Sequence, residues 1–203
     1  MKLRRLEMML EGVTGFHQPS PTLEQYMTPA PLASRLVHHA FLAGDIEDMT
    51  ICDLGCGTGM LGIGAALLGA SRVDGYDCDA TALEICSENA QKFSVEMNLH
   101  HLSLEDDMCD LPMHYDTILM NPPFGAQNVH ADRPFIDCSL KYADVVYGIF
   151  NAGSIAFIER YTRRRSTIRE RFHATIPLKK SFSFHTKEMY DIPVEVLVFD
   201  VLK

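Results

Sequence analysis

The chain has 203 residues, and 47% of them are hydrophobic, which is enough apolar material for one well-packed domain. No apolar run reaches the ~18 residues that cross a bilayer, so we expect no membrane segment. The net charge of −9 argues against a nucleic-acid partner unless the basic residues gather in one region.

Helix-like and strand-like segments alternate along the chain. We expect one domain, 1–203, with a helical N-terminal extension over about 1–45. Strands are expected at about 49–54, 71–77, 98–104, 115–121, 143–150, 174–184 and 193–202. Helices are expected at about 1–12, 59–69, 79–93, 132–141 and 153–171, and residues 23–43 are expected to form an entry segment whose helix starts near Pro29 or Pro31. This alternation predicts a doubly wound α/β fold with a mostly parallel sheet, and the two last strands, which no helix separates, predict an antiparallel hairpin.

Six cysteines are spread over the chain without a C-x-x-C pair, so we expect no metal site. Several lie in apolar stretches, where a free cysteine packs as a small hydrophobic side chain. The pairs His38-His39 and His100-His101 also lack carboxylate or cysteine neighbours at metal-ligand spacing. A reducing cytoplasm is the compartment that fits this pattern.

A glycine-rich turn follows the first expected strand, in the run ICDLGCGTGM at residues 51–60. The strand ends at Asp53, and Gly55, Gly57 and Gly59 follow at alternate positions. A turn of this kind between strand and helix lets a ligand approach the backbone, because no Cβ stands in the way. The next strand ends at Asp77, an acidic residue placed to hold a ribose diol. Taken alone, the turn is also compatible with a tight connection that binds nothing.

The run DTILMNPPFG carries the tetrapeptide Asn121-Pro122-Pro123-Phe124 directly after an expected strand. Hydrogen bonds from a planar amine to the Asn121 side-chain oxygen and the Pro122 carbonyl would pull its nitrogen toward sp³ geometry. The two prolines remove N–H donors and stiffen the loop, and the Phe124 ring offers a face on which a base stacks. The motif therefore indicates a site that alkylates an amine such as adenine N6; the simpler alternative is a proline-rich loop.

The motif pair D-L-G-C-G-T-G and N-P-P-F resembles the S-adenosylmethionine-dependent amino-methyltransferases. Together with LEQYMTPAPLASRL at residues 23–36 and FSFH at 182–185, it is similar to the methyltransferase-like protein 5 family, from about Leu3 to Leu202. This resemblance implies a seven-stranded sheet with an antiparallel last strand, S-adenosyl-L-methionine as cofactor, and methylation of adenine N6 in small-subunit ribosomal RNA. Asn121, Pro122, Pro123 and Phe124 would then be the catalytic residues.

The resemblance also assigns the cofactor contacts. The residues implied are Gln25, Thr28, Asp53, Gly55, Gly57, Thr58, Gly59, Met60, Asp77, Asp106, Asp107 and Met108. Those from Gln25 to Met60 would meet the methionine end, and Asp77 would hold the ribose. Either Asp107, with Met108 behind it, or Asp106 would contact the adenine ring.

The charge is unevenly distributed. Residues 160–187 carry nine of the 18 basic residues, whereas residues 45–116 carry 15 of the 27 acidic ones. This asymmetry predicts RNA binding through 160–187, with a solvated helix face as the alternative. The resemblance implies a second partner, a small zinc-containing activator protein, and places His185 beside the substrate cleft. Phe150-Asn151 stands where relatives often carry a basic residue.

Two other functions compete with this one. The first is methylation of a protein glutamine amide, but such enzymes usually have Tyr where this chain has Phe124. They also carry an N-terminal recognition domain, for which this chain leaves little room. The second is a catalytically idle, cofactor-binding assembly factor, against which the intact Asp53 and N-P-P-F motif argue.

Overall fold

The computed structural model of the chain describes residues 1–104, 109–179 and 189–203. Its seven strands form one sheet in the order β3-β2-β1-β4-β5-β7-β6. The strands are β1 (Thr50–Leu54), β2 (Arg72–Asp77), β3 (Asn98–His101), β4 (Tyr115–Met120), β5 (Ala143–Asn151), β6 (Ser166–Lys179) and β7 (Met189–Val201). The first five strands run parallel, and β7 is antiparallel to both β5 and β6. The predicted doubly wound sheet with an antiparallel last strand is therefore confirmed.

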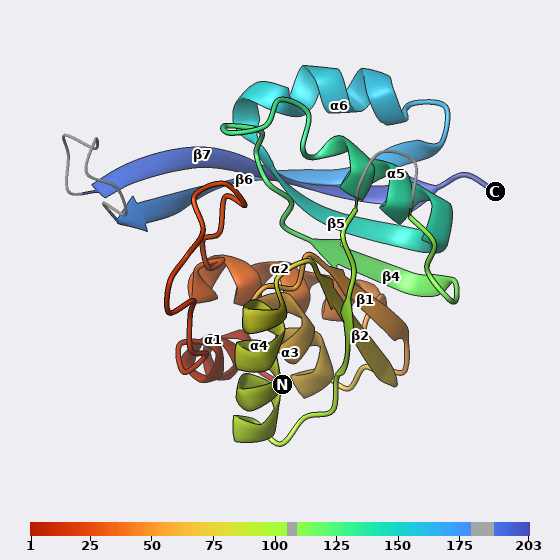
Figure 1. Ribbon diagram of the computed structural model, residues 1–203. Coiled ribbons are helices and arrows are strands. Elements are labelled where there is room, and N and C mark those ends of the chain that lie inside the picture. Colours follow the sequence, from red (N-terminus) through yellow and green to blue (C-terminus); the bar gives the residue numbers. More distant parts are fainter. Residues whose placement is uncertain (105–108, 180–188) are drawn as a thin grey trace.

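Helices cover both faces of this sheet (Figure 1). They are α1 (Leu3–Leu10), α2 (Ala30–Ala43), α3 (Met60–Leu67), α4 (Ala80–Lys92), α5 (Arg133–Tyr142) and α6 (Ile155–Thr162). In Figure 1, α1 to α4 lie on one side of the sheet, and α5 and α6 lie on the other. Each side has its own apolar cluster, because strands that are buried on both faces carry hydrophobic residues at successive positions. In the described part of the chain, no helix is long and apolar enough to cross a membrane.

The boundaries of the first half follow local signals. Asp79 is the N-cap of α4, and its side chain accepts a hydrogen bond from the Thr81 N–H, as the sequence predicts. Gly44 ends α2 in the left-handed conformation that glycine adopts most easily. Helix α3, MLGIGAAL, is buried along most of its length, and its small residues let it pack closely on the sheet. These elements place the ends of β1 and β2 next to each other.

The expected helix over 153–171 is wrong in its second half. Helix α6 ends at Thr162, and β6 already begins at Ser166. From Arg171 to Ile176 exposed residues alternate with more buried ones, which is the period of a strand and not of a helix. Ion pairs across the hairpin, from Arg169 to Asp200 at 3.1 Å and from Arg171 to Glu195 at 2.8 Å, help to hold this strand.

The cysteines divide into two groups. Cys52, Cys56 and Cys86 are free and buried, in line with packing as small hydrophobic side chains, and Cys78 is free and exposed. Cys109 and Cys138 form a disulfide, which joins the chain beyond β3 to helix α5. No local pattern predicts this bond, because the two residues are 29 positions apart and only the fold brings them together.

Candidate active site

A pocket of about 290 Å³ lies at the carboxyl ends of the parallel strands β1, β2 and β4. Its walls come from the glycine-rich turn after β1, the end of β2, the chain after β3, the N-P-P-F loop after β4 and residues 22–28. Strand order reverses between β1 and β4, and open α/β sheets bind ligands at such a point. The topology therefore collects residues from five separate parts of the chain around one cavity.

The glycine-rich turn approaches the pocket with its backbone. Gly57 has a φ of 52° and Gly59 a φ of 93°, both in the left-handed region that favours glycine. A Cβ on Gly57 would come within 2.9 Å of the Phe16 ring. The Gly57 N–H donates a 2.7 Å hydrogen bond to Asp77 Oδ2, which ties the turn to the end of β2. The turn thus has no space for side chains at these positions.

Asp53, at the end of β1, lines the pocket although its side chain is almost fully enclosed. Its Oδ2 accepts a 2.7 Å hydrogen bond from the Gly62 N–H. Burial raises the pKa of Asp53 to about 7, because that one hydrogen bond only partly offsets desolvation and the nearby Asp77 charge raises the value further. A cation bound in the pocket would relieve this cost, so Asp53 is placed to receive one.

Asp77 is the last residue of β2 and also lines the pocket. Its carboxylate accepts hydrogen bonds from the backbone N–H groups of Gly57, at 2.7 Å, and Asp79, at 2.9 Å. Burial nevertheless raises its pKa above the usual value. Gln25 reaches the same corner, where its Nε2 donates to Asp79 Oδ2 at 2.7 Å. Two carboxylates, Asp53 and Asp77, therefore face one small cavity.

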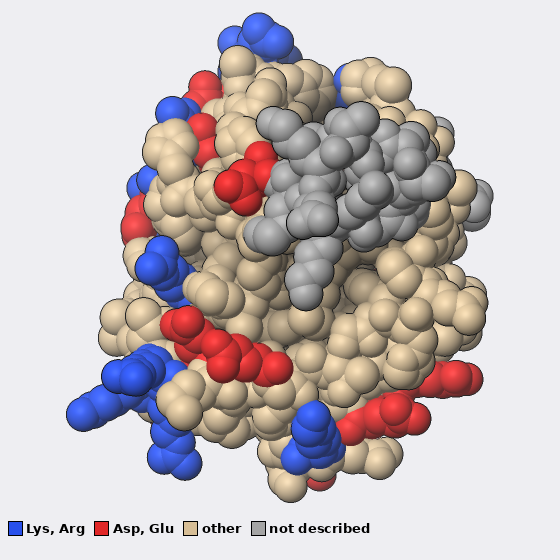
Figure 2. Space-filling view, turned by 90° about the vertical axis from the view of Figure 1, so that its left-hand side faces the viewer, with Lys and Arg blue, Asp and Glu red and all other residues tan. Residues whose placement is uncertain are grey.

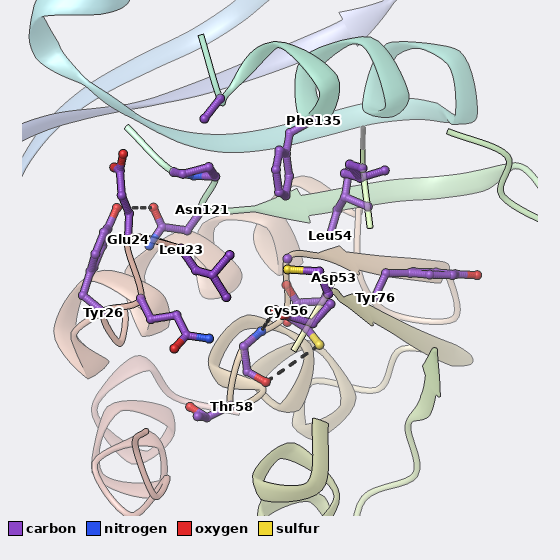
Figure 3. A pocket seen from close by; sticks show the side chains of 18 of the residues that line it. Leu23, Glu24, Tyr26, Asp53, Leu54, Cys56, Thr58, Tyr76, Asn121 and Phe135 are labelled. Atoms are coloured by element: carbon purple, nitrogen blue, oxygen red, sulfur yellow. Dashed lines mark hydrogen bonds between the residues drawn. The ribbon is translucent and has the colours of Figure 1, made fainter. Parts of the chain in front are cut away.

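The N-P-P-F loop forms another side of this pocket. The Asn121 Nδ2 donates to Thr28 Oγ1 at 2.9 Å, and the Tyr26 hydroxyl donates to Asn121 Oδ1 at 3.4 Å. Figure 3 shows the Tyr26 side chain next to Asn121, and Asp53 elsewhere on the wall. The Phe124 ring packs against Tyr26 with ring centroids 5.4 Å apart. An amide side chain, Asn121, and an aromatic face, Phe124, thus lie beside the carboxylates Asp53 and Asp77.

Most of the predicted site residues meet here. Those that line the pocket are Gln25, Thr28, Asp53, Gly55, Gly57, Thr58, Met60, Asp77, Asn121 and Pro123. Gly59, Pro122 and Phe124 are their direct neighbours in the same two turns. Asp106, Asp107 and Met108 lie outside the described residues, as do Lys180, His185 and Lys187 of the C-terminal segment. Among the described residues, no group of three His, Cys, Asp or Glu side chains is placed to hold a metal ion.

Other lining residues were not predicted. Phe16 and Phe135 close the pocket over Gly57 and Gly55, and no local pattern marks either of them. Glu24 lies in the segment LEQYMTPAPLASRL, and no local signal marks it, because its hydrogen-bond partner Phe124 is 100 positions away.

The methyltransferase small domain family matches residues 32–141 of this chain. The Drosophila melanogaster protein named rRNA N(6)-adenosine-methyltransferase Mettl5 is 35% identical over 99% of this chain and 97% of its own. The Danio rerio protein named rRNA N(6)-adenosine-methyltransferase METTL5 is 34% identical over 98% of this chain and 99% of its own. The crystal structure of PH1948 from Pyrococcus horikoshii superimposes with a TM-score of 0.91 at 34% identity, over 100% of this chain and 99% of that one.

Proposed function

Because the chain belongs to the methyltransferase small domain family and, within it, to the family of the METTL5 rRNA N(6)-adenosine-methyltransferases, we propose that it methylates adenine N6 in RNA with S-adenosyl-L-methionine. One observation carries this proposal: Asn121 of the N-P-P-F loop and the Asp53 carboxylate line the same pocket. A site for a flat amine and a site for a cationic ligand therefore lie within reach of each other. The substrate that the relatives' names imply is ribosomal RNA.

The residues present fit the cofactor. S-adenosylmethionine supplies an electrophilic methyl group on a sulfonium, and it also carries an ammonium group and a ribose diol. Asp53 and Asp77 match the cationic groups and the diol, and the glycine-rich turn leaves room for close backbone contact. We assign Gln25, Thr28, Thr58 and Met60 to the same cofactor site, together with the residues at 106–108 that lie beyond the described chain.

Asn121 would act on the amine. Its Nδ2 donates a hydrogen bond to Thr28 Oγ1, and its Oδ1 therefore faces the Tyr26 hydroxyl. An adenine amine that donates to this oxygen and to the Pro122 carbonyl would localise its lone pair toward the methyl group. The amine becomes acidic once it is methylated, so its proton can leave to water or Asn121, and no strong general base is needed.

RNA would meet the turn between α6 and β6. Arg160, Arg163 and Arg164 are exposed and have no ion-pair partner among the described residues. By contrast Arg165, Arg169 and Arg171 form ion pairs within the protein and serve the fold first. On the face shown in Figure 2, basic and acidic groups are interspersed, mostly toward the left and lower edges. We therefore narrow the proposed phosphate contacts to the three free arginines.

A charge reversal tests this contact. Replacing Arg160, Arg163 and Arg164 by Glu should weaken RNA binding and flatten its dependence on salt, because fewer counterions are released. Cofactor affinity should not change. An RNA affinity and salt slope equal to those of the unmodified protein would show that RNA docks elsewhere.

We also propose that a small zinc-containing protein partners this chain and that both work in the cytoplasm. Strand β3 ends the sheet and pairs only with β2 in the described part of the chain, so it offers an open edge. Cys52, Cys56, Cys78 and Cys86 are free thiols, which agrees with a reducing compartment, whereas the Cys109–Cys138 disulfide is uncommon in one. Hydrogen exchange should slow at β3 when the partner binds; unchanged exchange there, despite binding, would place the interface on another surface.

Asn121→Ala tests the proposed function itself. We expect single-turnover methyl transfer to an RNA hairpin with one unpaired adenine to be abolished, while cofactor binding stays intact. The same hairpin without adenine, and a glutamine-containing peptide, are the matched substrates. Transfer to the peptide alone would identify a protein methyltransferase. Cofactor binding without any transfer would indicate an idle assembly factor, and full activity of Asn121→Ala would remove the N-P-P-F loop from the chemistry.

A further inference from the structure

Residues 24–28, which we call the clamp segment, hold the N-P-P-F loop from one side. Among the described residues, side-chain hydrogen bonds connect this loop to Glu24, Tyr26 and Thr28. The two parts of the chain are about 100 positions apart, so the fold alone creates these contacts. The clamp segment also lines the pocket together with Asp53 and Asp77. It therefore adjoins both the N-P-P-F loop and the carboxylate part of the candidate site.

Glu24 binds the loop backbone with both carboxylate oxygens. The Phe124 N–H donates to Oε2 at 2.8 Å, and the Gln127 N–H donates to Oε1 at 2.8 Å. Proline has no N–H, so Phe124 provides the first backbone donor after Pro122-Pro123. Hydrogen bonds to a carboxylate are stronger than those between neutral groups, and two of them fix the direction of the loop as well as its distance.

Tyr26 and Thr28 fix the side chain that the loop presents. Thr28 accepts from Asn121 Nδ2, which sets the amide plane and turns Oδ1 toward Tyr26. Burial raises the pKa of Tyr26 well above its ordinary value, so its hydroxyl stays protonated and donates to that oxygen. The hydroxyl occupies the donor position at Asn121 Oδ1 that a substrate amine would take. Figure 3 shows Glu24, Tyr26 and Asn121 together at this edge of the pocket.

Glu24 has an unusual backbone conformation for a residue with a side chain. Its φ is +50°, in the left-handed region where residues other than glycine, asparagine and aspartate are uncommon. The residue is half-buried, and its carboxylate is directed at the loop and not at a basic side chain of the described chain. Left-handed residues that persist in a fold are held by their surroundings, and here the restraints are the two loop hydrogen bonds and the hydrogen bond from the Glu24 N–H to the Pro21 carbonyl, at 3.1 Å.

We propose that Glu24 is a positioning residue for methyl transfer, which holds the backbone of the N-P-P-F loop so that Asn121 and Phe124 meet the base in a fixed geometry. The proposal rests on the proposed function, because it concerns the same amine-binding loop. Glu24 does not touch the reacting atoms; it acts through the backbone of Phe124 and Gln127. Loss of that restraint should slow the chemical step, since small displacements of reacting groups reduce rates strongly.

Glu24→Gln provides a nearly isosteric test. One of its two terminal atoms becomes an NH2 group, which would face an N–H donor of the loop, so only one of the two hydrogen bonds survives. The matched control is Glu47→Gln, an exposed glutamate that precedes β1 at the opposite end of the sheet. Both variants are assayed as the full chain, in steady-state and single-turnover transfer to the adenine hairpin, with calorimetric titration of S-adenosylmethionine.

We expect Glu24→Gln to lower kcat roughly tenfold to hundredfold, with little change in the KM for RNA, in cofactor affinity or in Tm. Hydrogen exchange should accelerate at Phe124 and Gln127, and the control should behave like the unmodified protein. A kcat equal to that of the control, with faster exchange in the loop, would overturn the proposal. So would a loss of kcat that is matched by losses of cofactor affinity and Tm, because Glu24 would then serve the fold in general.

These outcomes are distinct from failure of the proposed function. If Asn121→Ala abolishes transfer and Glu24→Gln does not slow it, only the positioning role is lost. If the unmodified protein does not methylate the adenine hairpin, the proposed function itself fails. The exchange measurement alone would then show whether Glu24 restrains the loop.

Discussion

Two groups of carboxylates lie on the neighbouring strands β1 and β2, and their environments are opposite. Asp53, which is buried, and Asp77, which is half-buried, lie at the pocket ends of their strands, and burial raises the pKa of both. Asp74 lies near the start of β2 with a fully buried side chain. Burial raises its pKa as well, but hydrogen bonds from Arg72, Tyr115 and Asn98 outweigh this effect and lower the pKa below the ordinary value.

The difference lies in the partners. Asp74 receives Arg72 Nε at 2.9 Å, the Tyr115 hydroxyl at 2.7 Å and Asn98 Nδ2 at 2.7 Å, so its charge is compensated within the protein. Asp53 receives one backbone N–H, from Gly62. A carboxylate that is buried without a cation destabilises the fold, unless a ligand supplies the missing charge. The protein itself therefore compensates the charge of Asp74, whereas Asp53 has a single backbone N–H and no cationic partner among the described residues.

The largest effect on stability should come from neutralising Asp74, whose charge is compensated within the protein. Asp74→Asn leaves Arg72, Tyr115 and Asn98 with a weaker acceptor, so the free energy of unfolding should fall by about 3 kcal/mol. Urea denaturation measures this loss, with the exposed Asp48→Asn as the control. Cofactor affinity should remain unchanged. A variant that is as stable as the control would show that the Asp74 hydrogen bonds contribute little.

Asp77→Ala should act on binding instead. The ribose hydroxyls would lose a charged acceptor that is worth ~1.5–3 kcal/mol, so the affinity for S-adenosylmethionine should fall roughly tenfold to hundredfold. Calorimetric titration measures the change. An unaltered affinity would remove Asp77 from the cofactor site and restrict its role to holding the Gly57 turn.

Asp53→Asn should change stability in the opposite direction to Asp74→Asn. The neutral amide still accepts from the Gly62 N–H but no longer has to ionise in a buried position. At pH 8 we expect the cofactor-free protein to gain ~2 kcal/mol in free energy of unfolding, while cofactor affinity falls. Urea denaturation and calorimetry on the same sample measure both. A loss of stability, as for Asp74→Asn, would show that the charge of Asp53 is also compensated within the protein.

The smallest effect is the pH dependence of cofactor binding. The pKa of Asp53 is about 7 in the folded protein and about 4 when unfolded, so folding favours its protonated form between these values. Stability of the cofactor-free protein should therefore decline as the pH rises from about 4 to about 7. A cationic ligand prefers the ionised form, so affinity should rise roughly fivefold between pH 6 and 7. Asp53→Asn should show a flat profile; a rise that persists in this variant would assign it to another group.

Local patterns indicated the glycine-rich turn, the acidic strand ends and the N-P-P-F loop, whereas Gln25 and Thr28 came only from the resemblance. The run from Asp53 to Met60 is a single strand–turn–helix unit, so its glycine spacing predicts the turn without any knowledge of the rest of the fold. Asp79 as a helix cap and Asn121 at a strand end follow in the same way. The C-terminal third was harder, because the arginines that read as a helix face are paired across a β-hairpin.

The sequence by itself determined the doubly wound α/β fold, the glycine-rich turn, the acidic strand ends and the N-P-P-F loop. Each of these depends on residues that are neighbours in the chain. Only the tertiary structure decided how Asp53 and Asp74 differ, and which side chains hold the loop. Asp74 depends on Tyr115, 41 positions away, and Phe124 depends on Glu24, 100 positions away. Burial and partner geometry set pKa values and loop positions, and both arise only when distant segments pack together.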